Sequence, residues 1–160
     1  MEQGAYQRKD RLVAEQHKDV YREKEKFPES TQCKECGALF TGGRWTWKKT
    51  HEKVYVHICP ACRRRADSFP AGIIEIRGNF FKEHKDEILN MIYNVEKAEK
   101  EEHPLERIMN ITQNNHHVQV TTTGIHIARR IGEALAKSFN GENSFHFSND
   151  DTLLRVIWER

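Results

Sequence analysis

The chain has 160 residues, of which 37% are hydrophobic and 31% charged, and its formal net charge at pH 7 is +2. This composition excludes a chain that is disordered throughout, and the length suits one domain with a small module or two small domains. The small net charge does not decide between nucleic-acid and protein partners, because local imbalances can hide in the total. The polar start and the absence of a long apolar run predict a cytoplasmic protein with no membrane partner.

Residues 1–32 contain seven Lys or Arg and seven Asp or Glu, and their apolar residues are scattered without a helical stripe. Such a segment cannot bury a core by itself, so we predict a largely extended N-terminal arm. The arm is either a solvated tail or a segment that becomes ordered against a partner.

All four cysteines lie in two C-x-x-C pairs, Cys33 with Cys36 and Cys59 with Cys62. This spacing predicts two knuckles that together hold one tetrahedral Zn²⁺ ion, and disulfides or free thiols are weaker alternatives in a reducing compartment. His51 and His57 lie between the pairs, but a set of four thiolates needs no further ligand. A closed shell leaves no position for a substrate, so the ion is expected to be structural.

Residues 33–70 are predicted to form the zinc module. The segments Arg44–Trp47 and Lys53–Ile58 alternate like strands, and we expect them to pair as a hairpin with its turn at residues 48–52. A short helix over Arg63–Ser68 would end before Pro70. A knuckle, a hairpin, a second knuckle and a helix describe a treble clef, and the same module without the helix would be a zinc ribbon.

Residues 71–160 are predicted to form a second, α/β unit with the order β-α-α-β-α-β-β. The chain as a whole is therefore expected to be α+β, with one sheet covered on a single face by helices. In chain order, the expected elements are a strand at 73–77, a helix capped by Asn79 and running to 102, a short helix from Pro104, a strand at 117–123, a helix at 127–139, and a hairpin of 144–148 with 152–158.

Between Arg44 and Arg65 the chain has seven basic residues and a single acid, Glu52, with aromatic residues interleaved. Cationic side chains bind phosphates and flat aromatic rings stack on unpaired bases, so this combination favours RNA. A second basic pair follows the predicted start of a helix, where free N–H groups suit a phosphate. The candidate RNA-binding residues are Arg44, Trp45, Trp47, Lys48, Lys49, Arg63, Arg64, Arg65, Arg129 and Arg130.

Each of these residues also has a structural interpretation. The two tryptophans can pack the small core beside the metal, and the arginines can lie on solvated helix faces. No phosphate-binding loop, H-E-x-x-H or G-x-S-x-G motif occurs in the sequence. We therefore expect a protein that is not an enzyme and has no small-molecule substrate.

The segments CKECG, CPAC, IIEIRG and VQVTTTGIHIARRIGEALAKSFNG together resemble the NMD-type export adaptors of the large ribosomal subunit, over about two-thirds of the sequence. The longer match, from RWTW through CPACRRRADSFPAG to LLRVIWER, is similar to the compact bacterial members of that family. Unlike the eukaryotic adaptors, this chain has no further cysteine pairs and no further C-terminal domains, so nuclear export is not carried over.

The resemblance implies a ribosome-associated protein that binds large-subunit rRNA near the tRNA sites and acts in subunit maturation, stability or hibernation. It supports Cys33, Cys36, Cys59 and Cys62 as metal ligands and, less directly, Arg129 and Arg130 as a contact surface. The alternatives are a zinc-dependent nucleic-acid-binding regulator that reads DNA and an adaptor that binds another protein.

Overall fold

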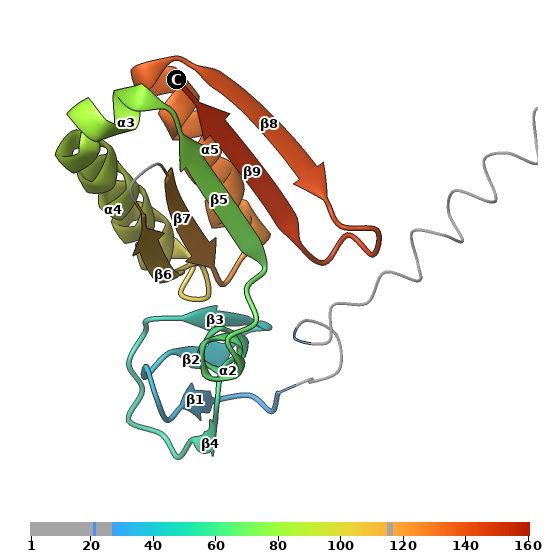
Figure 1. Cartoon of the computed structure of the whole chain (residues 1–160). Helices are drawn as coiled ribbons and strands as arrows, with labels where there is room; N and C mark the ends of the chain where they lie inside the picture. The colour runs from blue at the N-terminus through green and yellow to red at the C-terminus, as the bar shows by residue number, and fades with distance from the viewer. Residues whose placement is uncertain (1–20, 22–26, 115–116) are drawn as a thin grey trace, which may run out of the picture.

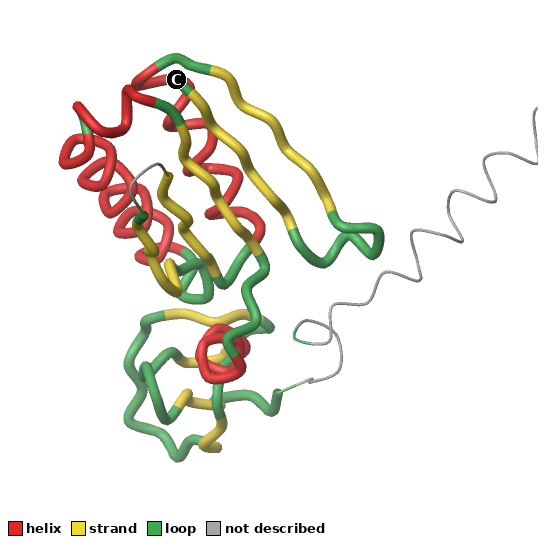
Figure 2. Tube along the Cα trace, in the orientation of Figure 1, coloured by secondary structure: helices red, strands yellow, loops and turns green. Residues whose placement is uncertain are grey.

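The computed structural model describes Tyr21, residues 27–114 and residues 117–160 (Figure 1). Most of the predicted N-terminal arm, residues 1–20 and 22–26, lies outside the described residues. The described chain is a mixed α+β structure, as predicted, and it contains two sheets and four helices. It divides into a cysteine unit, residues 27–70, and a sheet unit, residues 71–160 (Figure 2). Among the described helices, none has the length and apolar character needed to span a bilayer.

The cysteine unit is built on a small sheet with the strand order β3-β2-β1-β4, in which only the β1–β4 pair is parallel. A helix follows the last strand. The elements are β1 Thr31–Cys33, β2 Leu39–Thr41, β3 Arg44–Thr46, β4 Tyr55–His57 and α2 Pro60–Asp67.

The predicted hairpin within this unit is wrong in its pairing. Both segments form strands, but β3 pairs with β2, and β4 pairs with β1 at the opposite edge of the sheet. Gly42 and Gly43 have φ angles of 60° and 79°, which allow a tight two-residue turn between β2 and β3. This Gly-Gly turn decides the register, and residues 48–53 become a loop that crosses from one edge of the sheet to the other.

The cysteine unit also begins earlier than the predicted boundary at residue 33. Thr31 is buried in β1, and the ring of Phe27 packs against those of Phe40 and Trp45 at centroid distances of 5.6 and 5.1 Å. The last residues of the predicted arm are therefore part of this small core.

The sheet unit contains a five-stranded sheet with the order β6-β7-β5-β9-β8, in which only β5 and β9 run parallel. Its elements are β5 Gly72–Arg77, α3 Asn79–Glu83, α4 Lys85–Glu102, β6 Ile108–Gln113, β7 His117–Thr122, α5 Ile125–Phe139, β8 Glu142–Phe147 and β9 Leu154–Glu159.

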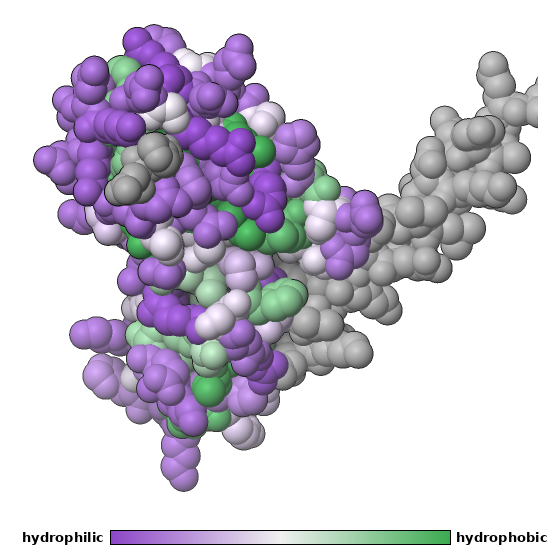
Figure 3. Space-filling view, in the orientation of Figure 1, coloured by the Kyte–Doolittle hydropathy of each residue, from purple (hydrophilic) through white to green (hydrophobic). Residues whose placement is uncertain are grey.

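One face of this sheet carries the core and is covered by α4 and α5, as predicted (Figure 1). On β5 the alternation is clear, since Ile74 and Ile76 are fully buried whereas Ile73 and Glu75 are only half-buried. Strands β7 and β9 alternate in the same way because their residues lie opposite those of β5. The other face is turned toward the viewer in Figure 3, where hydrophilic side chains cover most of it.

Two local predictions in this unit are wrong. The segment after Pro104 forms a turn and then strand β6, not a helix, because Ile108 and Ile111 gain more from pairing with β7 and packing on the core than a short helix would provide. Asn79 does not cap a helix. It is the first residue of α3, and the N-cap position is taken by Gly78, whose φ is 102°. The observed order is β-α-α-β-β-α-β-β.

Candidate metal centre

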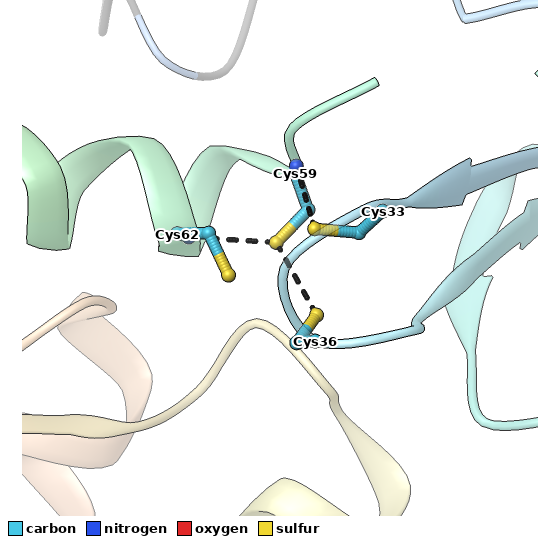
Figure 4. A group of neighbouring side chains, drawn as sticks. All are labelled: Cys33, Cys36, Cys59 and Cys62. Carbon is cyan, nitrogen blue, oxygen red and sulfur yellow. Dashed lines mark hydrogen bonds between the residues drawn. The ribbon is translucent and has the colours of Figure 1, made fainter. Parts of the chain in front are cut away.

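The four cysteine side chains converge from two segments of the cysteine unit (Figure 4). Their sulfur atoms all lie within 4.8 Å of one another, and none is in a disulfide. The Sγ atoms of Cys36 and Cys59 are 3.8 Å apart. Zn–S bonds of about 2.3 Å in a tetrahedron require sulfurs separated by about 3.8 Å. The residues present therefore fit a single metal ion, and the four predicted ligands are confirmed as one cluster.

The first pair occupies the turn between β1 and β2. The N–H of Gly37 donates to the carbonyl of Cys33 at 3.0 Å, and the N–H of Cys33 donates to the carbonyl of Ala38 at 2.8 Å. Gly37 has a φ of 80°, so a glycine is favoured at the tip of this turn. The turn brings both sulfurs of the pair to one side of the backbone.

The second pair lies at the start of α2, where Cys59 is the N-cap and Pro60 takes the first helical position. The N–H of Cys62 donates to the sulfur of Cys59 at 3.4 Å, and the N–H of Cys59 donates to the sulfur of Cys33 at 3.3 Å. These donors and the positive end of the helix stabilise thiolates. His51 and His57 are not members of the cluster that the described residues form.

A residue that the sequence analysis missed completes the surroundings of the sulfurs. Arg107 belongs to the sheet unit, yet its Nη1 lies 3.3 Å from the sulfur of Cys62 and its Nη2 lies 3.1 Å from that of Cys36 and 3.7 Å from that of Cys59. Arg107 is only 3% exposed. A single arginine inside a segment predicted to be a short helix has no distinguishing sequence signal, so only the folded chain could reveal it.

The guanidinium and the sulfurs shift each other's pKa values. The hydrogen bond from the thiol of Cys59, with further donors from the Ala38 backbone and from Arg107, lowers the pKa of Cys36 to about 4. Burial raises the pKa of Cys62. Burial by itself would lower the pKa of Arg107, but its hydrogen bonds to Cys62 and Cys36 raise it overall, so Arg107 remains a cation. A metal ion held by the four cysteines would displace their thiol protons, and Arg107 would then lie beside three of the four ligand sulfurs.

Three of the predicted RNA-binding residues, Arg44, Lys48 and Lys49, are exposed. Arg44 lies on the edge strand β3, and the two lysines begin the loop of residues 48–53 that also carries Lys53. Within the part of the chain that the structure describes, none of these four side chains has an ion-pair partner. We call these four residues the basic loop surface.

The three adjacent arginines of α2 differ from one another. Arg64 is only 4% exposed, donates from Nη1 to the carbonyl of Phe69 at 3.3 Å, and lies 4.3 Å over the ring of Tyr21. Arg65 is exposed and its Nη2 reaches the carbonyl of Ile108 at 3.4 Å. Arg63 is half-buried. Arg64 therefore serves the packing of the helix, which contradicts its assignment as a phosphate contact.

Both tryptophans are half-buried and packed, as in the structural alternative. Trp45 lies edge-on to Phe27, and the indole N–H of Trp47 donates to the carbonyl of Lys100 at 2.7 Å. The second contact joins the two units. An exposed aromatic residue of the cysteine unit is instead Tyr55, at 64% exposure on β4.

At the start of α5, where a phosphate site was predicted, both arginines are exposed but the helix N-terminus already has an anion of the protein itself. Oε2 of Glu106 accepts from the N–H of Ile127 at 3.0 Å. The Nε of Arg130 forms an ion pair with Oε1 of Glu99 at 3.1 Å. The guanidinium carbon of Arg129 lies 5.8 Å from the centroid of the Phe147 ring. The positive end of α5 is thus neutralised within the protein.

Replacing Glu106 by Ala is expected to lower the free energy of unfolding of the sheet unit by about 1 kcal/mol, because the first turn of α5 loses its carboxylate acceptor. Urea unfolding followed by circular dichroism measures the change. The matched control is Glu102→Ala, since Glu102 is exposed at the C-terminal end of α4. Equal stability of the two variants would show that Glu106 does not cap α5.

Two open grooves lie along α4. One, of about 480 Å³, lies where the units meet and is lined by Trp47, Tyr93, Glu96, Lys97, Lys100 and Glu101. The other, of about 410 Å³, is lined by residues of α4 together with Arg130. Both are open to solvent and carry several charged side chains on their walls, unlike the enclosed pockets that bind small molecules.

Comparisons of this chain with protein-family models, with curated proteins and with solved structures give no match.

Proposed function

We propose that this chain is a non-enzymatic, cytoplasmic, ribosome-associated protein that binds large-subunit rRNA near the tRNA sites. The cysteine unit would hold one structural zinc ion in a treble clef and dock on the RNA through the basic loop surface. Its place would be in maturation, stability or hibernation of the subunit. The observation that carries the proposal is a set of exposed cations, Arg44, Lys48, Lys49 and Lys53, which have no ion-pair partner among the described residues and lie on a unit built around a cluster that could hold a metal. The resemblance to the NMD-type adaptors supports the choice of partner.

The donor set supports zinc. Tetrahedral sites of four thiolates hold zinc or iron, and calcium and magnesium prefer oxygen ligands. One knuckle in a β-turn and the other at a helix N-terminus is the arrangement of a treble clef, in which zinc is structural. Elemental analysis by mass spectrometry of the purified protein distinguishes zinc from iron, and we expect one zinc ion per chain.

The charges of the cysteine unit support phosphate binding. Four thiolates and a divalent ion carry a formal charge of −2, which would repel RNA, but the buried Arg107 offsets part of it. The exposed cations of the basic loop surface are then free to displace counterions from RNA. Because Trp45 and Trp47 are packed, the proposal depends on phosphate contacts and not on base stacking by these rings.

Reversing the charges of the basic loop surface is expected to abolish co-sedimentation with the large subunit in a sucrose gradient. The variant combines Arg44→Glu, Lys48→Glu and Lys49→Glu. With an rRNA fragment in vitro, the slope of log affinity against log salt concentration should fall by about 0.7–0.9 for each phosphate contact that is lost.

The matched control reverses three exposed lysines of the sheet unit, Lys82, Lys85 and Lys137, which changes the net charge equally. We expect this control to sediment with the subunit. If the wild-type protein stays at the top of the gradient at low and moderate salt, in growing and starved cells alike, the proposal fails. Complexes that resist RNase and prefer one duplex sequence would instead indicate a DNA-binding regulator.

One observation favours an adaptor that binds another protein as the second candidate. Strand β4 is an edge of the small sheet, and its residues Tyr55 and Val56 are each 64% exposed. An exposed edge strand with apolar side chains suits a partner strand. Binding of that kind would survive charge reversal of the basic loop surface and would depend little on salt, so the sedimentation experiment separates the two functions.

A further inference from the structure

Arg107 is anchored in the sheet unit by its backbone. Its N–H donates to Oγ1 of Thr123 at 2.9 Å, and its carbonyl accepts from the N–H of Thr123 at 2.9 Å. Its Nε donates to the carbonyl of Pro104 at 2.6 Å, which fixes the direction of the side chain. The guanidinium therefore points out of the sheet unit from a rigid base.

The end of this side chain lies in the cysteine unit. Two amino groups of the guanidinium share the sulfurs of Cys36, Cys59 and Cys62, and none of the ion pairs among the described residues gives Arg107 a carboxylate. A buried cation is costly unless it is paired and hydrogen-bonded, so the thiolates are what make this position tolerable for an arginine. The ring of Trp47 lines the same site, and its centroid lies 5.7 Å from the guanidinium carbon of Arg107.

Two other hydrogen bonds join the units within the described residues, and in each the acceptor is an uncharged backbone carbonyl. The indole N–H of Trp47 meets the carbonyl of Lys100, and the side chain of Arg65 meets the carbonyl of Ile108. By contrast, Arg107 places a buried cation within 3.1–3.7 Å of three sulfur atoms. These sulfurs belong to the four-cysteine cluster, and a metal ion bound there would hold them in one arrangement.

We propose that Arg107 is a positioning residue that couples metal binding to the docking of the two units, so that the protein presents one rigid surface only when the metal is bound. A metal ion held by the four cysteines would fix the sulfurs that the guanidinium contacts, and the guanidinium would in turn orient those sulfurs and stabilise the loaded site. By linkage the two effects are reciprocal: whatever docking contributes to metal affinity, metal contributes equally to docking. This inference depends on the metal part of the proposed function and not on its RNA part.

The test compares Arg107→Met with the wild-type protein, since methionine keeps much of the volume of the side chain and removes its charge and donors. Zinc affinity is measured by competition with a chromogenic chelator, and we expect a loss of about 10- to 100-fold, as for other groups that orient metal ligands. The shape of the zinc-loaded protein is measured by small-angle X-ray scattering. We expect a larger radius of gyration for the variant with zinc bound.

Arg65→Gln is the matched control. Arg65 lies at the same boundary between the units, but its side chain bonds to the carbonyl of Ile108 and not to a sulfur. We expect its zinc affinity to stay within twofold of the wild type. Arg107→Lys, which keeps the charge but not the planar fork, should fall between the wild type and Arg107→Met.

A measurement on the wild type covers the case in which Arg107→Met does not fold. Chelation should increase hydrogen exchange at residues 105–108, which surround the anchor of Arg107, while β5 at the centre of the sheet stays protected. Wild-type zinc affinity in Arg107→Met, or unchanged exchange at residues 105–108 on chelation, would overturn the coupling and leave the proposed function standing. A wild-type protein without stoichiometric metal would overturn both.

Discussion

Chelation of the metal is expected to unfold the cysteine unit while the sheet unit keeps its structure. Among the described residues, the fully buried members of the cluster around the metal site are Cys33, Ala38, Cys59 and Ala61, and two of these are candidate ligands themselves. A core of this size cannot offset the conformational entropy of the chain, and structural zinc sites contribute about 10–16 kcal/mol of apparent binding free energy to small domains. The sheet unit has a separate and much larger apolar core.

Hydrogen exchange resolved by mass spectrometry measures this result segment by segment. Strands β1 to β4 should lose protection after treatment with a zinc chelator, and β5, β7 and β9 should keep it. The control is a chelator that is selective for calcium, which should change nothing, and addition of zinc should restore the protection. Full protection of β1 to β4 in protein shown to be free of metal would mean that the ion is dispensable for the fold.

Trp158→Ala is expected to destabilise the sheet unit by about 3–5 kcal/mol, because a fully buried indole is removed from a packed core. Trp158 lies on the core face of β9, contacts Phe80 edge-on at 6.2 Å, and donates from Nε1 to the carbonyl of Asn140 at 2.6 Å. Native domains are stable by about 5–15 kcal/mol, so this single change removes a large part of the total.

Urea unfolding of the zinc-loaded protein, followed by far-ultraviolet circular dichroism, gives the difference. Ile157→Ala is the matched control, since Ile157 is the preceding residue and lies on the half-buried face of the same strand. We expect Ile157→Ala to lower the free energy of unfolding by about 1 kcal/mol. If the two variants lost equal stability, the assignment of the core to one face of the sheet would be wrong.

Several features could be predicted because local physics decides them. Helix α5 follows from the stripe of Ile127, Ile131 and Leu135, all of which are fully buried against the sheet. The β8–β9 hairpin follows from two alternating segments around a polar turn. The prediction of a helix at Ile108 was wrong because a short apolar run fits a helix and a strand equally well. Pairing with β7 decided in favour of the strand.

By itself the sequence determined the metal ligands, since a C-x-x-C spacing constrains two sulfurs to one side of a tight turn whatever surrounds it. Only the tertiary structure decided what faces those sulfurs and what faces the start of α5. Arg107 is 45 residues from Cys62 and 71 from Cys36, and Glu106 is 21 residues from Ile127. Contacts over such separations depend on how sheets and helices pack, and no local periodicity encodes them. For the same reason, the folded chain turned Arg64 inward and left Arg44, Lys48 and Lys49 exposed.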